Sequence, residues 1–270
     1  MTGRQVLAIA LCVALNALDG FDVLSISFAS PGIAREWGID KAALGVVLSM
    51  ELIGMALGSV LLGQVADRWG RRKTTLACLA VMALGMLSTS QVMSIGALTI
   101  TRLVTGLGIG GMLATTNALV AEYANDKWRG AMVAVMAAGY PMGAIAGGAI
   151  ATSLLATGGW RDVFLLGAGM SAALLPLVPF LLPEPIGVLL HNRGGDTLAK
   201  VNRSLKALGH DPIETLPPVE PDTRRSRVSQ LFSHGTAPVT VLLTLAYFLH
   251  IMTFYFVLKW VPKIVVDMVV

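Results

Sequence analysis

The feature that most limits the folds open to this chain is a series of seven long apolar segments. They lie at residues 6–30, 42–65, 75–94, 97–121, 131–155, 163–183 and 237–260. An α-helix needs about 20 apolar residues to cross the ~30 Å hydrocarbon core of a bilayer, and each segment reaches that length. Charged residues make up 13% of the chain, against about 25% in an average soluble domain, and the mean hydropathy is +0.72. The sequence therefore predicts an all-α, multi-pass membrane protein.

The basic residues predict how these helices are oriented. Fourteen Lys and Arg residues lie in the N-terminal tail and in loops on the same side of the membrane, and five lie on the other side. The fourteen are Arg4, Arg68, Arg71, Arg72, Lys73, Lys127, Arg129, Arg193, Lys200, Arg203, Lys206, Arg224, Arg225 and Arg227, and the five are Arg35, Lys41, Arg161, Lys259 and Lys263. Because cytoplasmic loops carry the excess of Lys and Arg, we expect a cytoplasmic N-terminus. The net charge of +4 belongs to these loops, so we expect no nucleic-acid partner.

One segment, residues 184–236, has the composition of a soluble region. It carries charges of both signs and several prolines, and residues 198–208 have the pattern of a short amphipathic helix at the membrane surface. We expect the remainder to be a cytoplasmic linker. The predicted organisation is a six-helix transmembrane bundle at 1–183, the linker, and a seventh transmembrane helix at 237–270 that starts a truncated C-terminal bundle.

Four charged residues and one histidine lie inside the predicted spans. They are Asp19, Asp22, Glu51, Arg102 and His250. A charged side chain at the bilayer centre costs at least about 2.5–3.5 kcal/mol, so such residues usually serve an ion, a proton or a substrate. At about 1.5 Å of rise per residue, all five fall between the midplane and the outer quarter of the bilayer, where they can pair. Structural roles stay open: an Asp22–Arg102 ion pair, a protonated Glu51 bonded to a neighbouring helix, and simple packing of His250. The acids at 19 and 22 share one helix face because they are three residues apart.

The loop after the second span has a spacing that an ordinary basic loop does not explain. From residue 63 to residue 73 it reads G-x-x-x-D-R-x-G-R-R-K. The residues that define it are Gly63, Asp67, Arg68, Gly70, Arg71 and Arg72. Asp67 ends its own helix, where the helix dipole disfavours an anion, so we expect it to cap another helix or to pair with an arginine in a cytoplasmic gate. Gly70 permits the tight turn.

This loop, with the topology, resembles the major facilitator superfamily of secondary transporters. The fourth span has the R-x-x-x-G-x-G-x-G-G pattern of that superfamily, and the loop after it has the E-x(6)-R-G element. The residues concerned are Arg102, Gly106, Gly108, Glu122 and Arg129. Residues 183–185 are similar to its Pro-Glu-Ser-Pro element, with proline in place of serine. Close helix packing accounts for at least part of the role of the glycines.

Within the superfamily, the D-G-F-D of residues 19–22 resembles the first-helix signature of the aromatic acid:proton symporters. The resemblance implies uptake of benzoate, hydroxybenzoates or related acids across a bacterial cytoplasmic (inner) membrane, driven by the proton gradient and without a cofactor. Arg102 would attract the substrate carboxylate, and Asp19, Asp22 or Glu51 would bind and release protons. The partners are then a small aromatic acid, protons and the lipid bilayer.

Transporters of this kind have twelve helices in two halves, with the substrate bound between the halves near the midplane. The first, fourth and seventh helices line that cavity, and they carry Asp19, Asp22, Arg102 and His250. Since this chain provides seven helices, we expect either a truncated copy or a companion chain that supplies the missing C-terminal half.

Other interpretations stay open at this point. The same fold could carry another organic acid, a sugar or a drug, although residues 139–148 match the antiporter signature only in part. A truncated product could also lack transport activity altogether. The sequence has no hydrolase or redox constellation, so we expect no catalytic residue, no metal site and no enzyme.

Overall fold

The computed structural model of the protein describes residues 1–191, 194–217 and 237–269, and these ranges contain α-helices and no β-strand. The helices are α1 (Gly3–Trp37), α2 (Lys41–Trp69), α3 (Arg71–Gln91), α4 (Ile95–Tyr123), α5 (Arg129–Thr157), α6 (Trp160–Leu174), α7 (Leu177–Leu181), α8 (Ile186–His191), α9 (Thr197–Leu208) and α10 (Ala237–Val269). The all-α fold predicted from the apolar segments is confirmed.

Within these residues, seven stretches are long and apolar enough to cross a membrane. Five are α1 to α5, the sixth combines α6 and α7, and the seventh is α10. They measure 21 to 35 residues, which corresponds to about 32–53 Å at 1.5 Å per residue. All seven predicted spans are therefore present, and most extend beyond the predicted limits, because polar residues at a helix end do not stop the helix.

The sixth span is interrupted near its end. α6 ends at Leu174 and α7 begins at Leu177, with Pro176 between them. A proline inside a helix removes one backbone hydrogen bond and crowds the preceding turn. Leu175 and Pro176 nevertheless keep helical backbone angles, so the two helices continue along one span.

α2 and α4 pack closely because glycines line their contact. A Cβ atom on Gly54 would overlap the carbonyl oxygen of Leu103, and one on Gly106 would overlap the carbonyl oxygen of Glu51. Small residues let two backbones approach in a membrane, where apolar burial gives helices little reason to associate. Close packing thus accounts for Gly106, and it brings Glu51 next to the helix that carries Arg102.

α1 and α5 meet in the same way. The carbonyl oxygen of Ala17 occupies the position that a side chain at Gly143 would need. The carbonyl oxygen of Tyr140 likewise occupies the position that a side chain at Gly20 would need. Asn16 Nδ2 also donates a hydrogen bond to the carbonyl of Met136 on α5, at 2.6 Å. The glycines of the fifth span therefore serve helix packing in this bundle.

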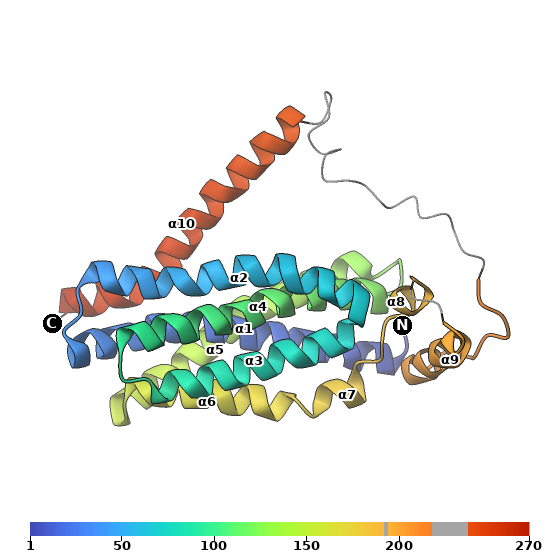
Figure 1. Cartoon of the computed structure of the whole chain (residues 1–270), viewed down its shortest axis with the longest axis horizontal. Coiled ribbons are helices and arrows are strands. Elements are labelled where there is room, and N and C mark those ends of the chain that lie inside the picture. Colours follow the sequence, from blue (N-terminus) through green and yellow to red (C-terminus); the bar gives the residue numbers. More distant parts are fainter. Residues whose placement is uncertain (192–193, 218–236, 270) are drawn as a thin grey trace. The chain divides into compact units, whose positions relative to one another are not determined.

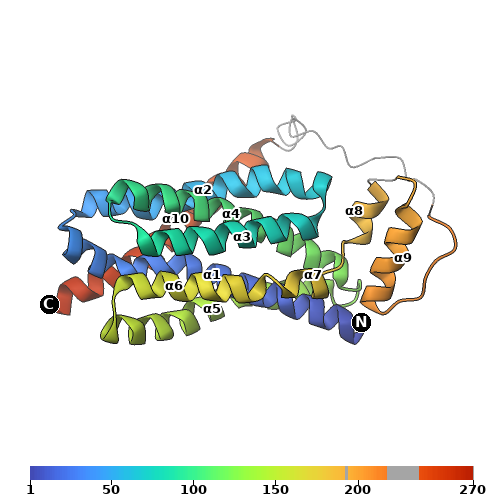
Figure 2. The same cartoon turned by 60° about the horizontal axis from the view of Figure 1, so that its bottom comes forward.

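The described chain divides into two units, Met1–Ile213 and Glu214–Val270. In the first unit, α1 to α7 run side by side, and α8 and α9 lie beyond the end of the bundle that holds the N-terminus (Figures 1 and 2). α9 confirms the amphipathic helix predicted at 198–208, with Val201 and Leu208 buried. Half of the remaining predicted linker, including Arg193, Arg224, Arg225 and Arg227, lies outside the described residues, and the predicted domain boundaries stay predictions.

The second unit contains α10, which extends past the predicted end at residue 260. The predicted span is the apolar run at 237–260, and Pro262 follows it within two residues. The helix instead includes Pro262 and runs to Val269. Pro262 removes one backbone hydrogen bond. This loss does not end a helix of 33 residues, because the segments before and after the proline are both apolar.

Candidate functional site

Several of the charged residues predicted inside the membrane come together around Arg102 on α4. Its side chain and that of Glu51 on α2 are both 0% exposed, and Arg102 Nη2 donates a hydrogen bond to Glu51 Oε1. The same nitrogen donates to the backbone carbonyl of Asp22 on α1, at 3.2 Å. Arg102 Nη1 donates to Met86 Sδ on α3 at 3.1 Å, and the guanidinium carbon lies 5.5 Å from the ring centre of Phe164 on α6. One buried arginine therefore contacts four neighbouring helices.

The partner of Arg102 differs from the Asp22 pair that the sequence left open. The ion pair joins Arg102 to Glu51, and Asp22 contributes its backbone carbonyl. The physical reason lies in the glycine contact of α2 with α4. Glu51 is one turn from Gly54 and Arg102 is one turn from Gly106, so the two side chains meet beside this close contact. Glu51 is indeed bonded to a neighbouring helix, and its partner there is an arginine.

Asp19 and Asp22 are buried on α1. Their side chains are fully enclosed, and none of the four carboxylate oxygens has a hydrogen-bond partner among the residues that the structure describes. Gly167 on α6 leaves room for Asp22, because a Cβ atom there would lie 3.0 Å from Asp22 Oδ1. An isolated buried charge is costly, and binding a proton removes it. The surroundings of Asp19 and Asp22 are therefore suited to carboxyl groups that take up and release protons.

His250 belongs to the second unit. It lies on α10, where its ring stacks on that of Phe254 with 6.4 Å between the ring centres. Both rings belong to α10, so this contact does not decide between the packing role and the functional role that the sequence left open. An association of His250 with Asp19, Asp22 and Arg102 stays a prediction.

A second set of charges lies at the end of the bundle that holds the N-terminus. Arg71 at the start of α3 forms an ion pair with Glu122 near the end of α4, and its Nη2 lies 3.4 Å from Asp67 Oδ1. The expected pairing of Asp67 with an arginine is thus present, and its role in a gate stays a prediction. The acid that bonds to the backbone at the start of α3 is Glu184, whose Oε1 accepts a hydrogen bond from Arg71 N at 2.5 Å.

Gly70 and Glu184 together shape this turn. Gly70 has φ +104°, in the left-handed region that favours glycine, and a Cβ atom there would lie 2.8 Å from both carboxylate oxygens of Glu184. Burial raises the pKa of the Glu184 carboxyl, and the hydrogen bond from Arg71 N–H lowers this pKa in part. Sequence reasoning noted residues 183–185 as an element but gave Glu184 no role. The sequence did contain a signal for such a role, because Glu184 stands between two prolines directly after the sixth span.

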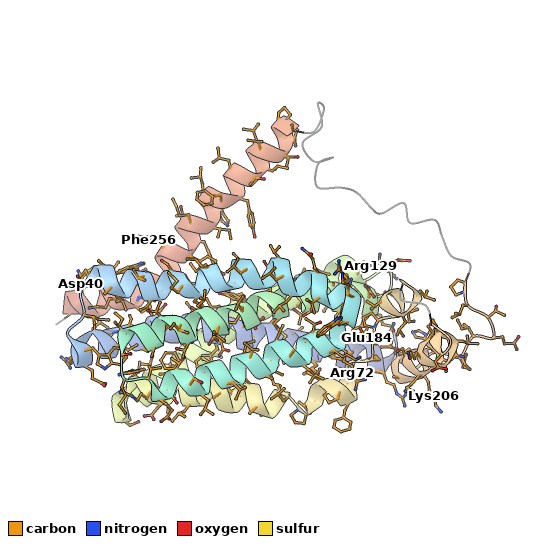
Figure 3. The ribbon with its side chains drawn as sticks, in the orientation of Figure 1. Asp40, Arg72, Arg129, Glu184, Lys206 and Phe256 are labelled. Atoms are coloured by element: carbon orange, nitrogen blue, oxygen red, sulfur yellow. The ribbon has the colours of Figure 1, made fainter. Side chains whose placement is uncertain are left out.

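The other motif residues have contacts that hold the same end together. Arg72 Nη2 donates to the carbonyl of Pro179 at 2.6 Å, and Arg129 Nη2 lies 2.7 Å from Asp126 Oδ1. Gly108 faces α3, where a Cβ atom would lie 2.9 Å from a backbone oxygen. Arg72, Arg129 and Glu184 gather at the end of the bundle opposite Asp40 (Figure 3). Within the described ranges, no group of three His, Cys, Asp or Glu residues is placed to hold a metal ion.

Comparison with known proteins identifies a family of transporters. The family model described as Major Facilitator Superfamily matches residues 9–268. The gallate transporter of Pseudomonas putida is 32% identical over 97% of this chain and 59% of its own length. The 4-hydroxybenzoate transporter PcaK of Pseudomonas aeruginosa is 30% identical over 96% and 58%, and the 3-(3-hydroxy-phenyl)propionate transporter of Escherichia coli is 29% identical over 98% and 58%. The chain therefore spans less than two thirds of the length of these relatives.

Solved structures share the fold. The xylose transporter XylE from E. coli, in a partially occluded inward open conformation, has a TM-score of 0.76 and 16% identity, over 99% of this chain and 66% of its own. Its inward open conformation has a TM-score of 0.70. The relatives carry the names of transporters, which agrees with the expectation that the chain is not an enzyme. Because the family model matches nearly the whole chain, the protein belongs to the Major Facilitator Superfamily.

Proposed function

We propose that this chain is the N-terminal part of a transporter that takes up an aromatic carboxylate together with protons. The relatives at about 30% identity are named as transporters of gallate, 4-hydroxybenzoate and 3-(3-hydroxy-phenyl)propionate, and each of these compounds joins a carboxylate to a hydroxylated ring. The observation that carries the proposal is the fully buried Arg102–Glu51 pair beside two buried acids whose carboxylates have no hydrogen-bond donor among the described residues.

In this proposal Arg102 holds the substrate carboxylate. A guanidinium presents a rigid fork of N–H groups that matches a carboxylate with two parallel hydrogen bonds. Arg102 Nε has no hydrogen-bond partner among the described residues, so it offers one further donor. The incoming carboxylate would compete with Glu51 for Nη2, and a displaced Glu51 would then gain from binding a proton. Substrate binding and proton binding are coupled in this way.

Asp19 and Asp22 are the proposed proton carriers. Moving one elementary charge against a membrane potential of 100 mV costs about 2.3 kcal/mol, so an anion entering a cell that is negative inside gains from carrying a proton. The two acids lie one helical turn apart on α1, and Asp22 contacts the Arg102 guanidinium through its backbone. A shift of α1 would therefore change the surroundings of both acids and of the arginine together.

The proposed placement puts the N-terminus, α8 and α9 on the cytoplasmic side of a bacterial inner membrane. The excess of Lys and Arg on this side supports that orientation. The Asp67–Arg71–Glu122 cluster lies at the same end. In this proposal it acts as a cytoplasmic gate. A second bundle of helices, as transporters built from two halves have, would complete the substrate cavity between the halves.

The test is proton-driven uptake of radiolabelled 4-hydroxybenzoate and gallate into vesicles that contain a complete transporter with these residues. Asp19→Asn or Asp22→Asn should reduce accumulation to the level of empty vesicles, because the amide cannot carry a proton. Ser30→Ala is the matched control, since Ser30 is buried on the same helix and bonds within it. If both Asn variants insert normally and still accumulate substrate against its gradient, the proposed proton coupling is wrong.

A further inference from the structure

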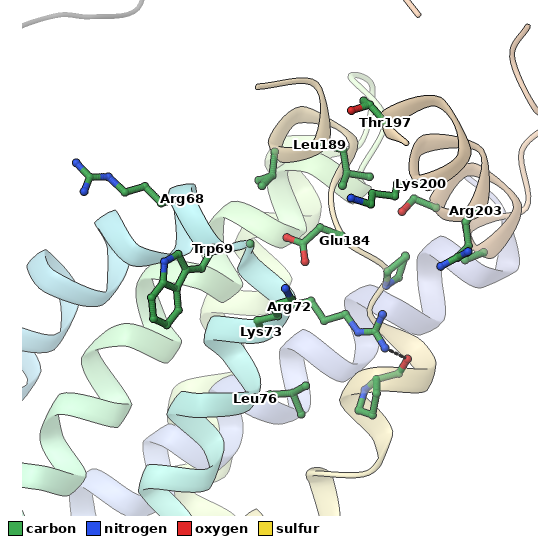
Figure 4. Close-up of a pocket in the computed structure, with 16 residues that line it drawn as sticks. Arg68, Trp69, Arg72, Lys73, Leu76, Glu184, Leu189, Thr197, Lys200 and Arg203 are labelled. Atoms are coloured by element: carbon green, nitrogen blue, oxygen red, sulfur yellow. Dashed lines mark hydrogen bonds between the residues drawn. The ribbon is translucent and has the colours of Figure 1, made fainter. Parts of the chain in front are cut away.

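A cavity of about 810 Å³ lies at the end of the first unit that holds the N-terminus, outside the buried charge cluster. Its walls come from the end of α2, the start of α3, the segment that joins α7 to α8, and one face of α9 (Figure 4). Trp69, Leu76 and Leu189 give it an apolar part. The volume lies within the range of about 300–1,000 Å³ that is typical of small-molecule sites.

The cavity carries an excess of positive charge. Its lining includes five basic residues and one acid, which are Arg68, Arg72, Lys73, Lys200, Arg203 and Glu184. The acid is already engaged, because it accepts a hydrogen bond from the backbone at the start of α3. Arg72 Nη2 donates to the carbonyl of Pro179, the bond drawn dashed in Figure 4, and this bond fixes one guanidinium in the wall. Positive charge is thus held around a space large enough for a ligand.

Two of the three basic residues of α9, Lys200 and Arg203, line the cavity and have no interaction that stabilises the fold within the described part of the chain. Lys200 and Arg203 are three residues apart and share one helix face. No hydrogen bond or ion pair with a described residue engages either side chain. Buried Val201 and Leu208 hold α9 in place, so the charges of Lys200 and Arg203 are not needed to dock this helix.

The cavity also lies where two membrane-spanning helices end. Trp69 is the last residue of α2 and is 75% exposed. Tryptophan is enriched at the interface between membrane and water. Basic pockets beside transmembrane helices are known to bind lipid head groups. The position therefore favours a ligand available at a membrane surface.

We propose that this cavity binds a phosphate group carried on an organic molecule, with Lys73, Lys200 and Arg203 as cationic contacts. The guanidinium of Arg203 can hold two phosphate oxygens at once, and the two ammonium groups act as point charges. A bare phosphate ion would leave most of the space and the whole apolar wall unused. An anionic phospholipid head group and a soluble phosphate ester share the required chemistry, and the two sources can be separated by experiment.

The experiment measures binding to the purified chain in an uncharged detergent by titration calorimetry. Four probes are compared: dihexanoyl phosphatidylglycerol, dihexanoyl phosphatidylcholine, glycerol 3-phosphate and inorganic phosphate. Binding of phosphatidylglycerol assigns the site to a lipid, and binding of glycerol 3-phosphate without phosphatidylglycerol assigns it to a soluble ester. Each basic residue near an anionic head group contributes about 1 kcal/mol, so Lys200→Gln with Arg203→Gln should raise Kd about 30-fold.

A matched control comes from the same helix. Lys206 is also basic and exposed on α9 but does not line the cavity, so Lys206→Gln should change Kd less than twofold. The exchange Lys200→Arg with Arg203→Lys keeps both charges and should retain most of the affinity, provided that circular dichroism shows an intact helix content. The proposal is overturned if no probe binds or if inorganic phosphate binds as tightly as the organic probes. It is also overturned if phosphatidylcholine binds as tightly as phosphatidylglycerol, or if the double Gln variant binds like Lys206→Gln.

Discussion

Two charge clusters in the first unit use the same residue types in opposite surroundings. Within the membrane-spanning bundle, Arg102 and Glu51 are both 0% exposed. At the end that holds the N-terminus, Arg71 is 17% exposed and its partners Glu122 and Asp67 are 31% and 68% exposed. Removing one partner of a buried pair costs about 3–5 kcal/mol, whereas exposed pairs contribute about 0–1 kcal/mol. The comparison indicates that burial, and not the number of ion pairs, decides how much stability the bundle loses when one partner of a pair is removed.

The clusters also differ in what fixes their geometry. The buried pair depends on how closely α2 approaches α4, which the glycines at 54 and 106 determine. The exposed cluster depends on a turn, because Gly70 and Glu184 set the start of α3 and so the position of Arg71. A change in helix packing should therefore disturb the first cluster, and a change in the turn should disturb the second.

The largest effect on stability is expected for Arg102→Met. Loss of the guanidinium leaves Glu51 buried without its partner, so the free energy of unfolding should fall by about 3–5 kcal/mol. SDS titration of the chain in mixed micelles, followed by circular dichroism, measures this change. The double variant Glu51→Met with Arg102→Met removes both charges and should recover most of the loss. If the double variant is no more stable than Arg102→Met, the loss does not come from an unpaired charge.

Helix packing is tested next by Gly54→Ala on α2. The added Cβ atom would overlap the Leu103 carbonyl oxygen, and overpacking of this kind costs about 1–3 kcal/mol. Gly63→Ala on the same helix is the matched control, because its Cβ atom would lie 3.8 Å from that of Ala114, an ordinary contact. This control should be neutral or slightly stabilising, since alanine favours a helix over glycine. Equal effects at 54 and 63 in the same titration would show that close approach is not what holds Glu51 beside Arg102.

A smaller, pH-dependent effect is expected at the turn. Burial raises the pKa of Glu184 in the folded chain above the value of about 4.3 that a glutamate has when unfolded. The folded state then binds more protons between these two values, so its stability falls as pH rises through the folded pKa. The side chain of Glu184→Gln cannot ionise, so this variant should lose this part of the pH dependence. Unfolding titrations that start near the unfolded pKa of about 4 and continue to higher pH would detect the loss. An unchanged difference between variant and wild type across that range would contradict the expected shift.

The membrane spans could be predicted from the sequence because a single quantity, the length of an apolar run, determines them. All seven predicted spans are found. Helix ends were less predictable: α1 continues through Pro31 to Trp37, where Gly38 with φ +61° ends it. An apolar run marks the part of a helix that lies in lipid, whereas the helix itself ends where the backbone changes direction.

The buried charges could also be located from the sequence, but their partners could not. Asp22 and Glu51 lie at similar depths, so depth alone did not decide which of them pairs with Arg102. The choice depends on the rotation of α2 and α4 about their axes and on their separation, and neither is encoded in hydropathy. The role of Glu184 was missed for a related reason, because the start of α3 lies more than 100 residues away along the chain.

The smallest effect is expected for Asp67→Asn, and it tests the exposed side of the comparison. Asp67 is the most exposed member of its cluster, and its contact with Arg71 spans 3.4 Å across one turn between two helices. Solvent screens such a pair, so the free energy of unfolding should change by no more than about 1 kcal/mol. Raising the salt concentration from about 0.1 M to 1 M shortens the screening length from about 10 Å to 3 Å, and should reduce even this difference. The pair of Arg102 with Glu51 is shielded from the same salt by the bundle, so the effect of Arg102→Met should persist. If Asp67→Asn lowered the free energy of unfolding as much as Arg102→Met does, the exposed cluster would stabilise the bundle more than solvent-exposed ion pairs can. Burial would then not be the deciding difference between the two regions.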